Sequence, residues 1–259
     1  GSYTFTPGTD FDDLAVGESR TVSFTYYATD DFGDNSASKT IEIEVTGAND
    51  APDITVGGAD SAAEGLAETD LPLSISGTLS VEDVDVTDTV STSVESVSIN
   101  GSSTGDAGAL TNADLLAMLS VDVGNIIDNV STTGTINWDF DSGTEAFNHL
   151  ADGETLVLDF TVRATDSQNP VAGTDDQIVT ITITGSNDAP VASDDSTPTT
   201  AENVVYNGNV PAATDVDDGI ASYALDTDLA AGSGSLSFNA DGSYTFTPGT
   251  DFDDLAVGE

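Results

Sequence analysis

The chain has 259 residues, of which 47 are Asp or Glu and three are Lys or Arg, so its formal net charge at pH 7 is -44. Three basic residues cannot form the positive surface that nucleic acid or an anionic membrane requires, so we expect no nucleic acid and no direct membrane contact. Charge of one sign opposes compaction, and the chain therefore needs cations or a large buried surface to stay folded.

The first 18 residues of the chain occur twice. Residues 1–18, GSYTFTPGTDFDDLAVGE, recur unchanged as residues 242–259, so residue 1 and residue 242 are 241 positions apart. A constant offset of this kind indicates a repeating unit. We therefore expect neighbouring identical repeats in the same long chain.

A hexapeptide divides the chain into modules. Residues 47–52 read GANDAP and residues 185–190 read GSNDAP, and each follows a run of alternating β-branched residues. Gly ends a strand, Asn and Asp offer side-chain oxygens, and Pro fixes φ and keeps the preceding residue extended. We interpret both hexapeptides as stiff linkers between modules.

The linkers and the repeat together predict the domain organisation. Residues 1–52 are expected to be the C-terminal part of a split module, residues 53–190 a complete larger module, and residues 191–259 the N-terminal part of the next copy of the split module. We expect the two parts of the split module to complement each other, either within a curled chain or head to tail between neighbouring chains.

The predicted elements are almost all strands. Residues 21–30 and 39–47 alternate as a pair of strands should, and residues 236–248 predict a hairpin that turns at Asp241 and Gly242. In the larger module, strands are predicted within residues 71–85, 91–101, 133–143, 154–166 and 176–185.

Within the larger module, alternation in the two last strands places their apolar residues on inward faces. The inward residues are Leu156, Leu158, Phe160, Val162 and Ala164, followed by Val179, Ile181 and Ile183. Trp138 is expected in the core, and Thr111 with Asp114 predicts the capped start of one short helix. The predicted fold class is all-β, with tandem cadherin-like or immunoglobulin-like β-sandwich modules, one complete and one split across the termini.

Acidic residues occupy corresponding places in the two modules. Each module has an early Glu, then an Asp-x-Asp pair, a Glu after Leu-x-x-Gly, an Asp at the end of an Ala-Thr-Asp strand, and a linker Asn-Asp. Calcium prefers six to eight oxygen ligands from carboxylates, amides and carbonyls. No EF-hand loop is present, because the sixth loop position after Asp215 is Ile220 instead of Gly. Calcium ligands must therefore converge from distant parts of the chain.

At these residues the sequence resembles cadherin-like tandem repeats, in particular the VCBS-type modules of large secreted bacterial adhesins of the RTX class. The resemblance rests on Asn-Asp-Ala-Pro at the module ends, on DGSYTFTP and on HLADGETLVLDFTVRATD. It implies Ca²⁺ between modules. For the junction from split to large module it implies the ligands Glu202, Glu18, Asn49, Asp50, Asp83, Asp85 and Asp166. For the junction from large to split module it implies Glu64, Glu154, Asn187, Asp188, Asp215, Asp217 and Asp30.

The sequence predicts no enzyme. His149 is the only histidine and Cys is absent, which excludes a zinc site and a Cys-His dyad. Residues 101–105 fit the G-x-S-x-G pattern, but a nucleophile elbow needs a strand before it and a helix after it, and here a hairpin-like loop is expected around the pattern. We expect a structural extender of a secreted adhesin at the bacterial cell surface, rigidified by calcium at the linkers. A calcium-dependent module that binds carbohydrate or another surface is the alternative.

Overall fold

A computed structural model describes residues 1–102, 107–168, 171–194 and 197–255. Its contacts divide the chain into two compact units, one of residues 1–147 with 154–184 and one of residues 148–153 with 185–259. Residues 103–105 of the G-x-S-x-G pattern lie outside the described residues. In the part of the chain that is described, no helix has the length and apolar character needed to cross a membrane.

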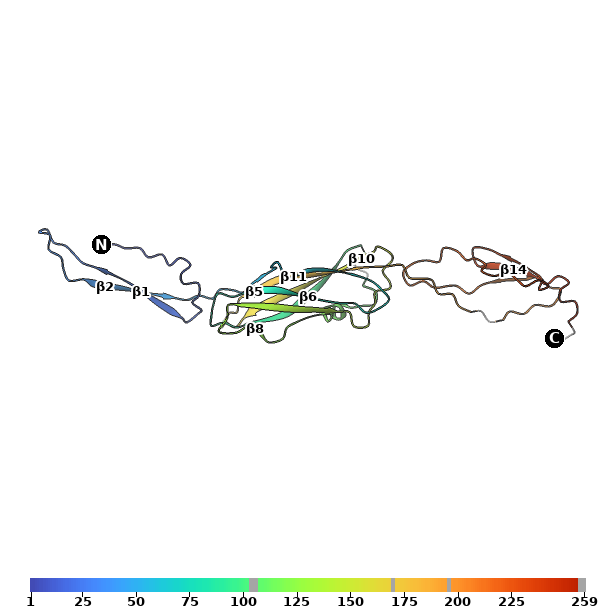
Figure 1. The fold of residues 1–259 in the computed structure, drawn as a ribbon, viewed down its shortest axis with the longest axis horizontal. Coiled ribbons are helices and arrows are strands. Elements are labelled where there is room, and N and C mark those ends of the chain that lie inside the picture. The colour runs from blue at the N-terminus through green and yellow to red at the C-terminus, as the bar shows by residue number, and fades with distance from the viewer. Residues whose placement is uncertain (103–106, 169–170, 195–196, 256–259) are drawn as a thin grey trace. The chain divides into compact units, whose positions relative to one another are not determined.

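The centre of the first unit is a β-sandwich of two sheets (Figure 1). One sheet has the strand order β4-β11-β10-β6-β8, and the other has the order β3-β5-β9-β7. The strands of the first sheet are β4 (Ala63–Ala67), β6 (Val90–Asn100), β8 (Asn125–Ile127), β10 (Thr155–Asp166) and β11 (Thr174–Thr184). Those of the second are β3 (Asp53–Thr55), β5 (Ser74–Glu82), β7 (Leu119–Val121) and β9 (Thr133–Asp141).

Alternation produces the core of this sandwich, as the sequence predicts. In β10 every second residue from Leu156 to Asp166 is buried, and in β11 the same holds from Val179 to Ile183. The Phe160 ring meets the ring of Phe140 on β9 edge to face, with 6.2 Å between ring centroids. These apolar rows hold the two sheets together.

Trp138 on β9 is fully buried, which confirms its assignment to the core. Its indole lies over Gly77, its ladder partner on β5, where an added Cβ would meet Trp138 Cζ2 at 2.3 Å. The indole N–H donates to the Ser61 carbonyl at 2.9 Å. A glycine at position 77 is therefore required by the space that the ring occupies.

The short helix is α1 (Asn112–Leu116). Thr111 is its N-cap and forms a reciprocal capping box with Asp114, which confirms the prediction. The helix does not change the fold class, which is all-β.

Residues 1–52 contribute two strands to the first unit. Both stretches predicted as strands are found as β1 (Ser19–Tyr26) and β2 (Lys39–Thr46), and they pair antiparallel along their whole length. Leu14 and Ala15 are buried beneath Gly47, where an added Cβ would lie 2.1 Å from the Leu14 carbonyl oxygen.

The second unit contains a three-stranded sheet of order β12-β14-β13. Its strands are β12 (Tyr206–Asn209), β13 (Ser235–Phe238) and β14 (Ser243–Thr247). Between β13 and β14 the chain turns as the sequence predicts, with Gly242 at a φ of +84°. At the start of this unit, a Cβ on Gly185 would lie 2.2 Å from the Leu150 carbonyl oxygen. This contact corresponds to the one between Gly47 and Leu14, so both linkers begin with the same close backbone approach.

Candidate metal centre

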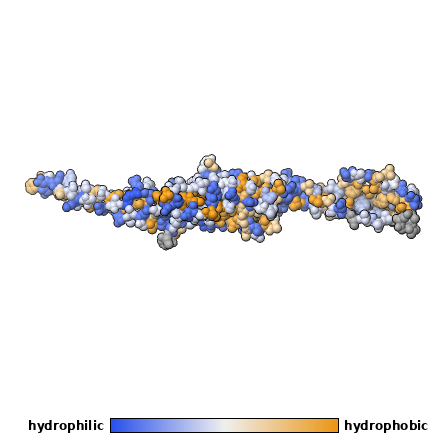
Figure 2. Space-filling model, turned by 60° about the horizontal axis from the view of Figure 1, so that its bottom comes forward, coloured by the Kyte–Doolittle hydropathy of each residue, from blue (hydrophilic) through white to orange (hydrophobic). Residues whose placement is uncertain are grey.

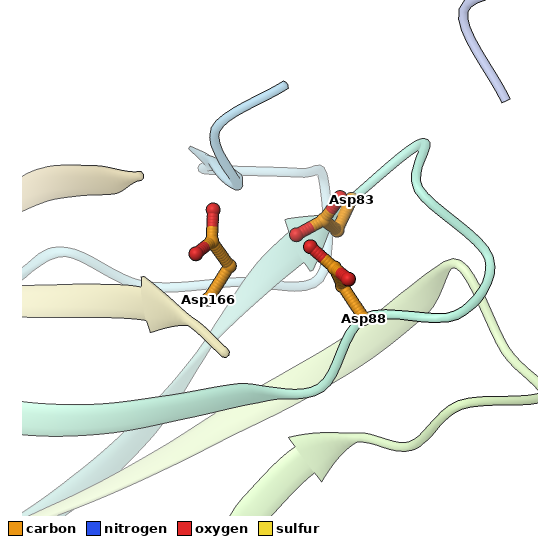
Figure 3. A group of neighbouring side chains, drawn as sticks. All are labelled: Asp83, Asp88 and Asp166. Atoms are coloured by element: carbon orange, nitrogen blue, oxygen red, sulfur yellow. The ribbon is translucent and has the colours of Figure 1, made fainter. Parts of the chain in front are cut away.

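Four aspartates gather at one end of the sandwich, beside the first linker. Asp83 follows β5 directly, Asp85 and Asp88 lie in the loop before β6, and Asp166 is the last residue of β10. All four are at least 95% buried. Carboxylates of Asp83, Asp88 and Asp166 each offer an oxygen within 4.8 Å of the others. Figure 3 shows these three side chains turned toward a common space. We call the four aspartates, with Asn49 of the linker, the linker site.

Backbone hydrogen bonds shape the loop that carries the site. The Asp83 N–H donates to the Thr132 carbonyl at 2.9 Å, which fixes the loop against the chain before β9. The Asp85 N–H donates to Asp83 Oδ1 at 3.0 Å, and the Asp88 N–H donates to the Asp85 carbonyl at 2.9 Å. These bonds form a tight turn that holds three carboxylates together.

The linker is joined to this loop through its Asn and Asp. Asn49 Nδ2 donates to Asp166 Oδ2 at 2.9 Å, and the Asp50 N–H donates to Asp85 Oδ2 at 2.9 Å. Asp166 also accepts from the backbone of Gln168 at 3.0 Å and of Gly173 at 2.9 Å. The structure thus brings together five residues expected at the first junction, Asn49, Asp50, Asp83, Asp85 and Asp166, and adds Asp88.

The buried carboxylates of the loop are only half satisfied. In Asp83, Asp85 and Asp88, one oxygen accepts a hydrogen bond and the other has no hydrogen-bond partner. Asn49 Oδ1 is buried and likewise without a hydrogen-bond partner. A buried polar atom without a partner costs free energy, more so when it is charged. Carboxylate and amide oxygens of this kind are the hard donors that Ca²⁺ takes, and two of them belong to Asp83 and Asp88 of the carboxylate cluster.

The electrostatics of the site favour a cation. Burial raises the pKa of Asp83 to about 6, and the charges of Asp85, Asp88 and Asp166 push it in the same direction. Burial also raises the pKa of Asp85 and of Asp88. Desolvation and like charge both oppose ionisation here, and a bound divalent cation would relieve both.

Asp88 is a site residue that the sequence analysis missed. Its Oδ1 accepts from Gln168 Nε2 at 2.6 Å, while its Oδ2 belongs to the unpartnered set. The available signal was the spacing, because Asp88 comes three residues after the Asp-x-Asp pair. At the corresponding position of the split module stands Ile220. The two linkers therefore do not carry the same set of acids.

The remaining residues predicted for the first junction lie differently. Glu18 precedes β1 and accepts from the Ala15 N–H at 3.2 Å, and its charge contributes to the raised pKa of Asp88, after burial and Asp166. Glu202 belongs to the second unit, where Asn203 Nδ2 donates to it at 3.2 Å. Glu18 therefore lies close enough to the linker site for its charge to raise the pKa of Asp88, whereas Glu202 lies in another unit.

In the second unit, four residues of the second predicted junction interact. The Asp188 N–H donates to Asp217 Oδ2 at 3.2 Å, as Asp50 does to Asp85 in the first junction. Asn187 Nδ2 donates to the Asp188 carbonyl at 2.6 Å. Oδ1 of Asp215 and Oδ1 of Asp217 are buried and have no hydrogen-bond partner, although both residues are half-buried as a whole. A hydrogen bond with Asp215 lowers the pKa of Asp217.

Three other residues predicted for that junction belong to the first unit. Asp30 Oδ1 accepts from the N–H groups of Phe32 and Asp34, both at 2.9 Å, and closes the loop between β1 and β2. Glu64 on β4 accepts from Ser61 Oγ, and Glu154 precedes β10.

Glu68 is a second acid that the sequence analysis did not select. It is 2% exposed and follows β4, and its N–H donates to the carbonyl of Thr184, the residue before the second linker. The early Glu nearest the end of β11 is thus Glu68, four positions after Glu64.

The chain was compared with curated protein sequences and with solved structures. No curated protein sequence matches the chain. Among solved structures, the extracellular domain of protocadherin GammaB4 is 14% identical with a TM-score of 0.37, covering 89% of this chain and 34% of its own. AggA, the major subunit of Escherichia coli aggregative adherence fimbriae type I, is 10% identical with a TM-score of 0.31, covering 53% of this chain and 97% of its own. The chain thus spans about a third of the protocadherin.

A family model supplies the more specific match. Residues 187–257, which include β12, β13 and β14, match the model of a bacterial Ig domain. Together with the two-sheet sandwich of the first unit, this match shows an all-β, immunoglobulin-like fold.

Proposed function

We propose that the chain is a structural extender segment of a bacterial cell-surface adhesin, in which Ca²⁺ at the linkers stiffens the connection between modules. The observation that carries the proposal is the linker site, with four buried oxygens that lack hydrogen-bond partners. The bacterial Ig match and the resemblance to VCBS-type modules of secreted RTX-class adhesins support the extracellular setting.

The geometry of the linker site explains how calcium would stiffen the chain. Asn49 belongs to the linker, whereas Asp83, Asp85, Asp88 and Asp166 belong to the sandwich. A cation that binds both groups would cross-link the linker to the sandwich and neutralise carboxylates that otherwise repel. Extracellular calcium modules have dissociation constants on the order of 10⁻⁴ to 10⁻³ M. Such a site would fill outside the cell, where calcium is plentiful.

The test is a pair of thermal melts, in calcium and in excess chelator, with calorimetric titration of calcium. We expect calcium to raise Tm of the wild-type chain. In Asp88→Asn the calcium affinity should fall by about tenfold or more, because one buried charged ligand is lost. The same variant should melt at a higher temperature than wild type in chelator, because it removes a repelling buried charge.

Asp139→Asn is the matched control, since Asp139 is exposed on β9. Its calcium affinity and calcium-dependent Tm should equal those of wild type. Small-angle scattering would report the stiffening directly, as a change in the scattering profile on chelation. Melting and scattering that ignore the chelator would contradict the proposed function.

A further inference from the structure

The duplicated segment of the chain is found in two different surroundings. Residues 243–247, SYTFT, form β14, which is bonded to β12 on one side and to β13 on the other. Residues 2–6 have the same sequence but form no strand. Instead they lie over the β1–β2 pair, where the rings of Tyr3 and Phe24 meet edge to face at 5.1 Å. The sequence SYTFT is thus a strand within a sheet at residues 243–247, whereas at residues 2–6 it covers the face of the β1–β2 pair.

The β1–β2 pair presents an incompletely covered apolar face. Val22 and Phe24 on β1 are paired with Ile43 and Ile41 on β2. Phe24 is 39% exposed and Tyr26 is 49% exposed, although Tyr3 lies beside them. Tyr3, Phe24, Tyr26 and Ile41 also line a groove of about 400 Å³. A two-stranded pair of this kind is not stable by itself in water and needs a second layer.

The three-stranded sheet of the second unit presents a similar face. The ladder aligns Phe246 with Leu236 and with Tyr206, and it aligns Tyr244 with Phe238. Residues directly opposite in a ladder point to the same side, so these five side chains share one face. None of the five is buried, and Figure 2 shows apolar residues on the surface of this part of the chain, at the right of the view.

The duplicated sequence, residues 1–18 and 242–259, allows the two faces to be compared. Phe5 and Phe11 form an edge-to-face pair with 6.1 Å between centroids and 78° between planes. Their counterparts Phe246 and Phe252 form the same pair, at 6.1 Å and 74°. The relative placement of these two rings is therefore the same in both copies, which gives a common reference for laying one copy on the other.

This superposition builds a sandwich. Tyr3 contacts Phe24, while its counterpart Tyr244 contacts Tyr206 with 6.0 Å between ring centroids. If β14 takes the place of residues 2–6, the sheet β12-β14-β13 lies on the β1–β2 pair, with the tyrosine between the two layers. The strands of this sandwich, β12, β13 and β14 followed by β1 and β2, then have the order that they would have in a chain of consecutive repeats. In such a chain, the position after residue 259 corresponds to Ser19.

We propose that the β1–β2 face is the docking site for the second unit of another copy of this chain. The β12-β14-β13 sheet of one molecule docks on β1–β2 of the next and completes an immunoglobulin-like sandwich. The interface joins two different surfaces, so each added molecule brings one further face of each kind and assembly runs head to tail. Residues 2–6 are displaced, because β14 is held by ladders on both sides, whereas residues 2–6 belong to no strand and contact the face through the Tyr3 ring.

Sedimentation velocity of the full chain, from micromolar to near-millimolar concentration, tests this assembly. High salt and calcium are required to screen the net charge of -44. We expect the average mass to grow with concentration beyond that of a dimer. Phe24→Asp should weaken association by about tenfold or more, because it places a charge in the apolar layer. Phe32→Asp is the control, since Phe32 is 94% exposed in the loop between β1 and β2, and its association should equal that of wild type.

The duplicated tyrosine supplies a sharper pair of variants. Tyr3→Ser removes the contact that holds the covering segment, so it should strengthen association. Tyr244→Ser changes the same residue of the repeat in the docking sheet, so it should weaken association. A chain that stays monomeric at every concentration, including a compact monomer that closes on itself, would overturn the proposal. Equal effects of Phe24→Asp and Phe32→Asp would overturn it as well.

Discussion

Asp83 illustrates how a single residue links the linker site to pH. Burial raises its pKa to about 6, above the ordinary value of 3.8. A carboxyl group with a raised pKa binds more protons in the folded chain than in the unfolded chain between these two values. Its contribution to stability is therefore largest at low pH and is lost as the pH rises through about 6. Calcium bound at the linker site as proposed would reverse this dependence, because it would bind the ionised carboxylate.

A pH series of melts on wild type and Asp83→Asn would check this contribution. In chelator, we expect the variant to gain stability relative to wild type as the pH rises from about 4 to about 7, because only wild type acquires the buried charge. In calcium, wild type should gain relative to the variant over the same range. Other acids, such as Asp60 and Asp176, have lowered pKa values and act in the opposite direction, but they are common to both chains and cancel in the difference. A difference that does not change with pH would show that Asp83 is not a buried carboxylate of this kind.

At the scale of elements, the pairing of β5 with β9 depends on one glycine. Gly77 lies opposite Trp138 in the ladder, and an added Cβ would meet the indole ring at 2.3 Å. The ring is fully buried between the sheets and cannot move away without disturbing its neighbours.

Gly77→Ala should therefore lower the free energy of unfolding of the sandwich, by roughly 1–3 kcal/mol as for other overpacked sites. Trp138 is the only tryptophan, so its fluorescence during denaturant unfolding follows this sandwich directly. Gly65→Ala is the control, because a Cβ on Gly65 of β4 would meet nothing within 4 Å. Equal stabilities of the two variants would contradict this role of the ring.

At the scale of the whole molecule, the two linkers share a backbone design and differ in acids. Gly47 and Gly185 make the same close approach to a carbonyl, and Asp50 and Asp188 donate to corresponding aspartates. The first linker adds Asp88 and fully buried carboxylates, whereas the second has Ile220 and half-buried ones. More charged ligands in a more rigid site bind calcium more tightly.

Calcium titration of the whole chain should therefore show two classes of site. Asp88→Asn should weaken the tighter class and leave the weaker one unchanged. Asp217→Asn should weaken only the other class. A single class of sites, or one that both substitutions weaken equally, would contradict the difference between the linkers.

The sequence alone determined the class of fold and most of its elements. Alternation in residues 154–166 and 176–185 predicted β10 and β11, and Thr111 with Asp114 predicted the cap of α1, because these signals are local. The exact recurrence of residues 1–18 likewise required no structure.

The tertiary structure decided which acids meet. Asn49 and Asp166 are 117 residues apart in sequence and are hydrogen-bonded, and Asp88 joins them through the turn after β5. It also placed Glu68, and not Glu64, next to the last residue of β11. Local patterns report the period of a strand, but the convergence of side chains depends on strand ends and loops that only packing brings together.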